Sequence, residues 1–154
     1  MKRILIVYHS QQSGNTAKMA ELVAQGCRQV EGIEVELVNV NEARVEMAAA
    51  EQADAYALGS PNYYSYVAGG LKQFFDDIHI AQGAGRSVGG KPYVAFCTHG
   101  GGGSINAVIE KLASAMKLRK VAGSVTARLA PEGQAADDSV ALGRALAEHV
   151  GATA

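Results

Sequence analysis

The chain has 154 residues, 48% of them hydrophobic, and 14 Lys and Arg against 15 Asp and Glu give a formal net charge of −1. That length suits one domain over residues 1–154, and the apolar share is too high for a disordered chain. A near-neutral protein has no long-range field that would attract phosphate backbones, which argues against nucleic acid as a partner.

The two cysteines, Cys27 and Cys97, are too few for a disulfide framework or, alone, for a metal site. They favour reduced, buried thiols in a cytoplasmic protein. No apolar run approaches the roughly 20 residues of a membrane span. The apolar start, Ile4–Tyr8, is too short for a signal peptide and polar residues soon follow it, so we interpret it as a buried strand.

The first half of the chain alternates strand and helix patterns. Ile4–Tyr8 is a continuous apolar run, typical of a strand covered on both faces. From Ala17 onward, apolar residues recur at spacings of three and four, which predicts a helix. Ile33–Val40 starts with alternating apolar and acidic residues, which indicates a less buried strand near a sheet edge. Residues 41–50 predict a short Ala-rich helix, and residues 53–59 a third strand.

The second half continues the alternation. A loop with one proline and three tyrosines follows the third strand, and a loop with four glycines follows the fourth. Either Asp137 or Asp138 is placed to cap the last helix. The predicted segments are a loop at 60–66, a helix at 67–79, a connector at 82–90, a strand at 93–97, a loop at 98–104, a helix at 105–116, a strand at 120–127 and a helix at 137–150.

This alternation predicts an α/β fold, with a parallel sheet covered by helices on both faces. Ligands of such sheets bind beyond the carboxyl ends of the strands, near the point where the strand order reverses. The loops after the first, third and fourth strands all leave that edge, and they are the most unusual segments of the chain. We therefore expect the binding site where these three loops meet.

The first of these loops, Ser10–Thr16, joins a buried strand to a helix N-terminus and contains no Lys or Arg. Free backbone N–H groups and the helix dipole bind phosphate without a cationic side chain, and Gly14 lets the backbone come close. Neither a Walker A sequence nor a dinucleotide glycine fingerprint is present. The pattern favours the terminal phosphate of a mononucleotide, and the alternative is an ordinary capped helix start.

The other two loops favour a flat ring. Tyr63, Tyr64 and Tyr66 cannot all pack inward, so at least one is expected to lie exposed beside the pocket and stack on a ring. The alternative is that they shield the core or a subunit contact. Glycines at 100–103 let backbone groups face a planar heterocycle. Tyr64 and His99 are the candidates for a direct role there, although His99 also fits an ordinary polar loop residue.

Taken together, these segments resemble the flavodoxin-like superfamily, whose members bind FMN. Val7–Thr16 is similar to the family's phosphate loop, Ser/Thr-x-Ser/Thr-Gly-x-Thr, but is one residue longer, with Gln11 and Gln12 where one residue is usual. Gly59–Tyr64 and the helix sequence 69–76 look like the flavin-ring loop of flavodoxin-family FMN reductases and WrbA-type NAD(P)H:quinone oxidoreductases. Residues 98–103 are similar to their glycine-rich third loop.

The resemblance implies a flavodoxin-like three-layer sandwich with a five-stranded parallel sheet in the order 2-1-3-4-5, and FMN as cofactor. It leaves open which of Ser10, Gln11 and Gln12 contacts the phosphate. The residues that it implies around FMN are Ser10, Gln11, Gln12, Ser13, Gly14, Asn15, Thr16, Pro61, Asn62, Tyr63, Tyr64, Ser65, Thr98, His99, Gly100 and Gly101.

Two functions share this site. One is an oxidoreductase that passes hydride from NAD(P)H through FMN to a quinone or similar acceptor, and the other is an electron carrier between partner proteins. Carriers that resemble flavodoxin are usually acidic, and this chain has a net charge of only −1, which favours the enzyme. A third hypothesis is a non-catalytic FMN-binding module. The acceptor, the choice of NADH or NADPH, and the oligomeric state, a homodimer included, stay open.

Overall fold

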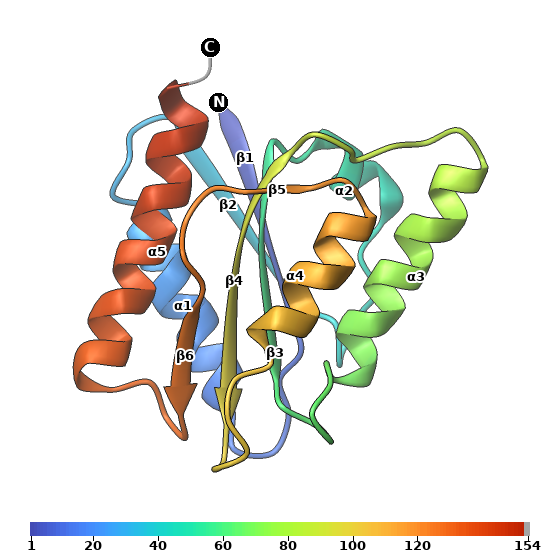
Figure 1. Cartoon of the computed structure of the whole chain (residues 1–154). Helices are drawn as coiled ribbons and strands as arrows, with labels where there is room; N and C mark the ends of the chain where they lie inside the picture. The colour runs from blue at the N-terminus through green and yellow to red at the C-terminus, as the bar shows by residue number, and fades with distance from the viewer. Residues whose placement is uncertain (153–154) are drawn as a thin grey trace.

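The computed structural model describes residues 1–152, in which a six-stranded parallel sheet lies between two layers of helices (Figure 1). The strand order is β2-β1-β3-β4-β5, and β6 also pairs with β4. This confirms the predicted flavodoxin-like fold, the order 2-1-3-4-5 and the edge position of β2. The strands are β1 (Lys2–Tyr8), β2 (Ile33–Asn39), β3 (Ala55–Pro61), β4 (Pro92–His99), β5 (Arg119–Lys120) and β6 (Val125–Arg128).

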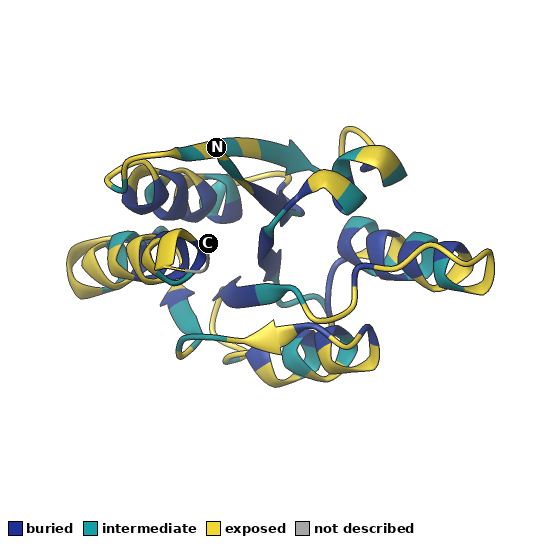
Figure 2. Ribbon diagram, turned by 90° about the horizontal axis from the view of Figure 1, so that it is seen from above, coloured by how far each residue is buried: buried dark blue, intermediate teal, exposed yellow. Residues whose placement is uncertain are grey.

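Each face of the sheet buries its own apolar core. Leu5 and Val7 of β1 belong to the cluster on one face, and Ile4 and Ile6 to the cluster on the other. This is the arrangement expected for a central strand whose side chains alternate between two covered faces. Helices α1 (Asn15–Cys27) and α5 (Gly133–Ala152) cover one face, and α2 (Met47–Gln52), α3 (Gly69–Gly83) and α4 (Asn106–Ala115) cover the other (Figures 1 and 2).

The single strand predicted at 120–127 is wrong, because the structure has two strands there. Pro92 of β4 pairs with Arg119, whereas Phe96 pairs with Val125. An advance of four residues along β4 therefore corresponds to an advance of six residues along the segment that pairs with it. The extra residues loop out between β5 and β6. The apolar sequence pattern continues through the segment between β5 and β6 because Val121 and Ala122 still pack against the core.

Two predicted helix starts are also wrong. The helix predicted at 41–50 begins at Met47, since the carbonyl of Asn39 accepts the N–H groups of Glu42 and Ala43 and holds that segment in a turn. The last helix begins at Gly133 rather than at Asp137. Asp137 and Asp138 therefore lie inside α5 and cap nothing, and Asp138 accepts a hydrogen bond from Gln134 one turn earlier.

Helices α1 and α5 approach each other through glycines. A Cβ on Gly26 would lie 1.9 Å from the carbonyl oxygen of Val140, and one on Gly143 would lie 1.9 Å from that of Val23. At this contact the Cys27 thiol donates to the carbonyl of Gly143 at 3.3 Å. Burial raises the pKa of Cys27 to about 12. Both cysteines are free and buried, as predicted.

None of the helices within residues 1–152 is long and apolar enough to cross a membrane.

Candidate functional site

The three loops predicted to form the site do meet, beyond the carboxyl ends of β1, β3 and β4, at the lower edge of the sheet in Figure 1. They enclose a cavity of about 150 Å³. Five of the predicted residues, Ser10, Gly14, Tyr64, Ser65 and Gly101, do not line it. The lining residues are Gln11, Gln12, Ser13, Asn15, Thr16, Pro61, Asn62, Tyr63, Thr98, His99, Gly100 and Leu129.

The first loop contributes to this cavity residues whose backbone N–H groups have no acceptor within residues 1–152. Helix α1 starts just after Gly14, which has a φ of +71° and whose N–H donates to the carbonyl of Gln11. Four lining residues, Gln12, Ser13, Asn15 and Thr16, have backbone N–H groups without an acceptor in the described part of the chain. Donors clustered at a helix N-terminus fit an anion that only accepts hydrogen bonds, such as a phosphate.

Ser10 is buried, does not line the cavity, and holds the loop in place. Its hydroxyl accepts the N–H of Ala17 in the first turn of α1, at 3.1 Å. Its own N–H donates to Oδ1 of Asn39, and its carbonyl accepts from Nδ2 of the same residue, both at 3.0 Å. The Ser10 hydroxyl thus satisfies one N–H group in the first turn of α1, although the residue at the N-cap position is Gly14. Asn39, at the end of β2, is a supporting residue that sequence reasoning missed.

Hydrogen bonds tie the three loops together. Thr16 and Thr98 are both buried and share a hydrogen bond of 2.8 Å between their hydroxyls. Asn62 donates its backbone N–H to the carbonyl of Thr98 at 2.8 Å and its side-chain amide to that of Gly103 at 3.0 Å. These contacts link the first loop to the third, and the second to the third. The cavity is therefore largely preformed.

His99 shapes the glycine-rich loop. Its ring atom Nδ1 accepts the backbone N–H groups of Gly101 and Gly103, at 3.0 and 3.2 Å. Because both partners are donors, Nδ1 carries no proton and the ring proton lies on Nε2. His99 lines the cavity, and its Nε2 makes no hydrogen bond within residues 1–152. These contacts fit the loop role weighed from the sequence, whereas a role of His99 toward a ligand stays a prediction.

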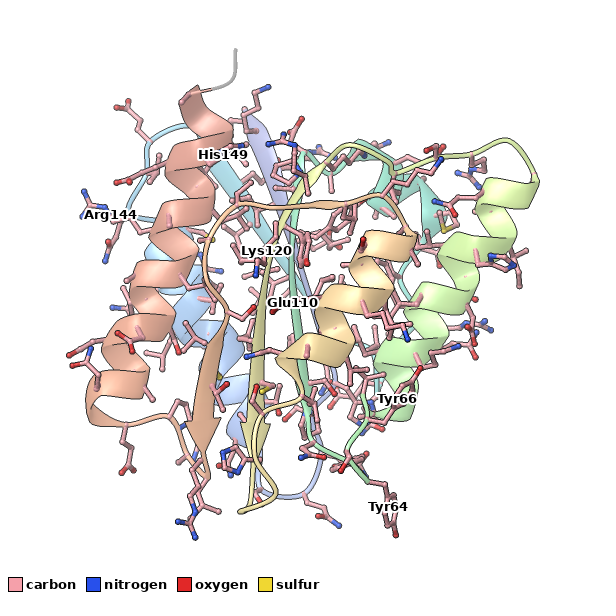
Figure 3. All side chains as sticks on the ribbon, viewed as in Figure 1. Tyr64, Tyr66, Glu110, Lys120, Arg144 and His149 are labelled. Atoms are coloured by element: carbon pink, nitrogen blue, oxygen red, sulfur yellow. The ribbon has the colours of Figure 1, made fainter. Side chains whose placement is uncertain are left out.

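The tyrosines of the second loop separate. Tyr63 lines the cavity, whereas Tyr64 is fully exposed and projects into solvent (Figure 3). Tyr63 and Tyr66 exchange two backbone hydrogen bonds of 3.1 Å around Tyr64 and Ser65, whose φ angles are +57° and +61°. A turn with positive φ at both central residues normally carries Asn-Gly. A side chain there costs about 1–2 kcal/mol per residue, so the loop holds Tyr64 outward at an energetic cost.

Leu129 completes the rim and was missed by sequence reasoning. It follows β6, is 55% exposed, and has a φ of +60°. Its N–H donates to the carbonyl of His99 at 2.8 Å, which places it beside the third loop. Its position after a strand that ends at the same sheet edge could have indicated it. The prediction of a single strand at 120–127 hid where that strand ends.

A larger cavity, of about 600 Å³, lies at the opposite edge of the sheet between β1, β2 and α2. Three of its polar side chains already bond to one another, since Arg3 donates to Glu34 and to Gln52. The smaller cavity instead collects N–H donors without acceptors, and it lies where ligands of parallel sheets bind. We therefore take the smaller cavity as the candidate functional site.

Comparison with known proteins gives a consistent picture. The family model described as NADPH-dependent FMN reductase matches residues 1–139. A flavodoxin of Aquifex aeolicus is 42% identical over 108 residues, which is 70% of this chain and 56% of that protein. An NAD(P)H dehydrogenase (quinone) of Acidithiobacillus ferrooxidans is 32% identical over 122 residues, covering 66% of this chain and 60% of that protein. The chain thus spans less than two thirds of the length of either relative.

Among solved structures, a flavodoxin from the domain Archaea superposes with a TM-score of 0.83 at 23% identity. The match covers 97% of this chain and 99% of that one. At that identity the likeness supports the fold alone.

Proposed function

The chain belongs to the NADPH-dependent FMN reductase family, and on that premise we propose that it is an oxidoreductase that takes hydride from NAD(P)H and passes it through FMN to a quinone or similar acceptor. That it is a flavodoxin-like FMN-binding protein follows from the family and the fold. The nucleotide, the acceptor and the residues in contact with them are our proposal.

The donor set of the first loop suits the phosphate of FMN. The unpartnered N–H groups of Gln12, Ser13, Asn15 and Thr16 would hold it, with the dipole of α1 behind them. No lysine or arginine lines the cavity, so these dipoles would carry the binding of the anion. When bound, FMN supplies the redox chemistry, which no side chain of this site provides.

The ring of the cofactor would lie outside the enclosed volume. A cavity of about 150 Å³ is below the roughly 300–1,000 Å³ usual for small-molecule sites, so it suits the phosphate end of the cofactor. We assign the ring to the rim, between the second loop with Tyr64 and Ser65 and the third loop with Gly100 and Gly101. Tyr64 is exposed there and offers a stacking face, and the glycines leave the other side open to a second reactant.

The observation that carries the enzyme hypothesis is that the second and third loops, residues 60–66 and 98–104, between which we place the flavin ring, contain no Asp, Glu, Lys or Arg. A carrier steered to partner proteins benefits from a charged surface around its redox group, whereas a small uncharged acceptor such as a quinone does not depend on such steering. The likeness to the quinone dehydrogenase points the same way. The electron carrier remains the second candidate because the chain is 42% identical to a flavodoxin over 108 residues.

An anaerobic titration distinguishes the two candidates. The FMN-loaded protein is mixed with NADH and then with NADPH while flavin absorbance is followed, with free FMN as the control. Rapid bleaching of the bound flavin, faster than that of free FMN, is expected for direct hydride transfer. A flavin that binds and stays oxidised with both nucleotides contradicts the enzyme reading and supports the carrier.

A further inference from the structure

His9 is a buried histidine that the assignments above do not use. It follows β1 and is 5% exposed. Its Nδ1 accepts the backbone N–H of Gly70, in the first turn of α3, at 3.1 Å. Its Nε2 lies 2.6 Å from Oε1 of Gln11, and the edge of the ring meets Tyr63 with the centroids 5.9 Å apart. One imidazole thus joins α3, the first loop and the second loop.

These contacts define the direction of each hydrogen bond. The N–H of Gly70 can only donate, so Nδ1 must be unprotonated and the proton of the neutral ring must lie on Nε2. Nε2–H therefore donates, and the end of the Gln11 amide that faces it must be the oxygen. A Cβ on Gly70 would lie 2.7 Å from Nδ1, so the glycine makes room for this contact.

The hydrogen bond from His9 to Oε1 of Gln11 also has a consequence for the Nε2 group, at the other end of that amide. With Oε1 engaged by His9, the Nε2 group of Gln11 keeps two N–H donors, for which the described residues offer no acceptor. Gln11 lines the cavity beside the backbone donors of the first loop. Without His9 the amide could flip and present its oxygen, which repels a phosphate.

We propose that His9 is a positioning residue that orients the Gln11 amide with its N–H donors toward the phosphate of the flavin, so that the pair selects FMN over riboflavin. This proposal rests on the function proposed above, and it assigns Gln11 as the side chain of the first loop that contacts the phosphate.

The test uses the flavin-free full chain titrated with FMN and with riboflavin, following flavin fluorescence. In His9→Asn, Oδ1 can still accept the N–H of Gly70, but no donor reaches Gln11. FMN affinity is expected to fall about tenfold while riboflavin affinity stays unchanged, since only the phosphate contact is lost. Gln11→Met, at an exposed position, should give the same loss, and the double variant no further loss.

His79→Asn, on the exposed face of α3, is the matched control and should bind both flavins normally. Equal losses for FMN and riboflavin in His9→Asn, or losses that multiply in the double variant, overturn the proposal. If His9→Asn fails to fold, two measurements still test the proposal: the flavin affinities of Gln11→Met, and nitrogen NMR of the His9 ring in the unaltered chain. A proton found on Nδ1 of His9 overturns the proposal. If the unaltered chain binds FMN no better than riboflavin, the phosphate site itself is wrong, which is a separate outcome.

Discussion

At Gly14, in the first loop, the effect of an added side chain can be divided into the effect of its charge and the effect of backbone strain. Gly14 has a φ of +71°, and a Cβ added there would meet no atom within 4 Å. Crowding of the new Cβ therefore does not explain the effect of a side chain at this position. What remains is the strain of a left-handed backbone, which Asn and Asp tolerate best, and the charge that Asp would bring to the donor cluster.

We expect Gly14→Asp to lose FMN affinity by about a hundredfold, because a carboxylate beside the phosphate repels it. Gly14→Asn carries a side chain of the same shape without the charge, and should bind FMN within a few-fold of the unaltered protein. Titration of both variants with FMN measures the difference. Equal losses in the two variants would mean strain rather than charge, and unchanged affinity in Gly14→Asp would contradict the phosphate site.

Positive φ angles also mark the rim. Tyr64, Ser65 and Leu129 are exposed residues other than glycine with φ between +57° and +61°. Such strain persists only where the surrounding structure enforces it, and it is common at functional sites. Here the enforcing contacts are the paired backbone bonds of Tyr63 and Tyr66, and the bond from Leu129 to His99. Of the five non-glycine residues with positive φ in the described part of the chain, these three thus lie where we place the flavin ring, Gln12 lines the cavity, and Lys117 lies elsewhere, after α4.

Among the helices, the closest packing is that of α1 against α5. Gly26 and Gly143 bring the two backbones together, and the carbonyl of Val23 stands where a Cβ on Gly143 would lie. This contact fixes how α1 lies on the sheet. Because the first loop begins at the end of β1 and leads into α1, the same contact helps to hold the phosphate donors in place.

Gly143→Ala is expected to destabilise the protein by about 2–3 kcal/mol, since the new methyl group forces the helices apart. Gly151→Ala, on the same helix, is the matched control, because its Cβ would meet only Val30 at an ordinary distance of 3.8 Å. It should be neutral or slightly stabilising, as alanine favours helix. Urea denaturation of both variants checks this, and equal stabilities would contradict the close contact.

The molecule as a whole should lose stability in alkali. Burial raises the pKa of Cys27 from 9.0 to about 12 and also raises the pKa of Tyr56 above its ordinary value of 10.0. The folded state therefore holds these protons more tightly than the unfolded state. The stability that they contribute is complete below the unfolded pKa values and is lost as pH rises through the folded ones.

We expect the urea midpoint to fall progressively above about pH 9, where the thiol of the unfolded chain starts to ionise. Cys27→Ala removes one of the two groups, so its midpoint should fall less steeply over the same range even if its baseline is lower. If the urea midpoints of the two proteins fall in parallel between about pH 8 and about pH 11, Cys27 does not ionise on unfolding.

Much of the architecture could be read from local pattern. The continuous apolar run at Ile4–Tyr8 and the alternation at Ile33–Val40 predicted a central and an edge strand, and the structure confirms both. Such patterns succeed because burial on two faces or on one leaves a periodic trace in the chain. The loops at the carboxyl edge could be named for the same reason, since parallel topology brings them together.

Details that depend on contacts between distant segments were not accessible in this way. The break between β5 and β6 depends on pairing with β4, and the start of α2 depends on the turn held by the carbonyl of Asn39. The orientation of the Gln11 amide depends on His9 and thereby on Gly70, which lies 61 residues from His9 along the chain. Local sequence carries the burial pattern that builds the sheet and its loops, whereas hydrogen-bond direction and close backbone contact exist only once remote segments have packed together.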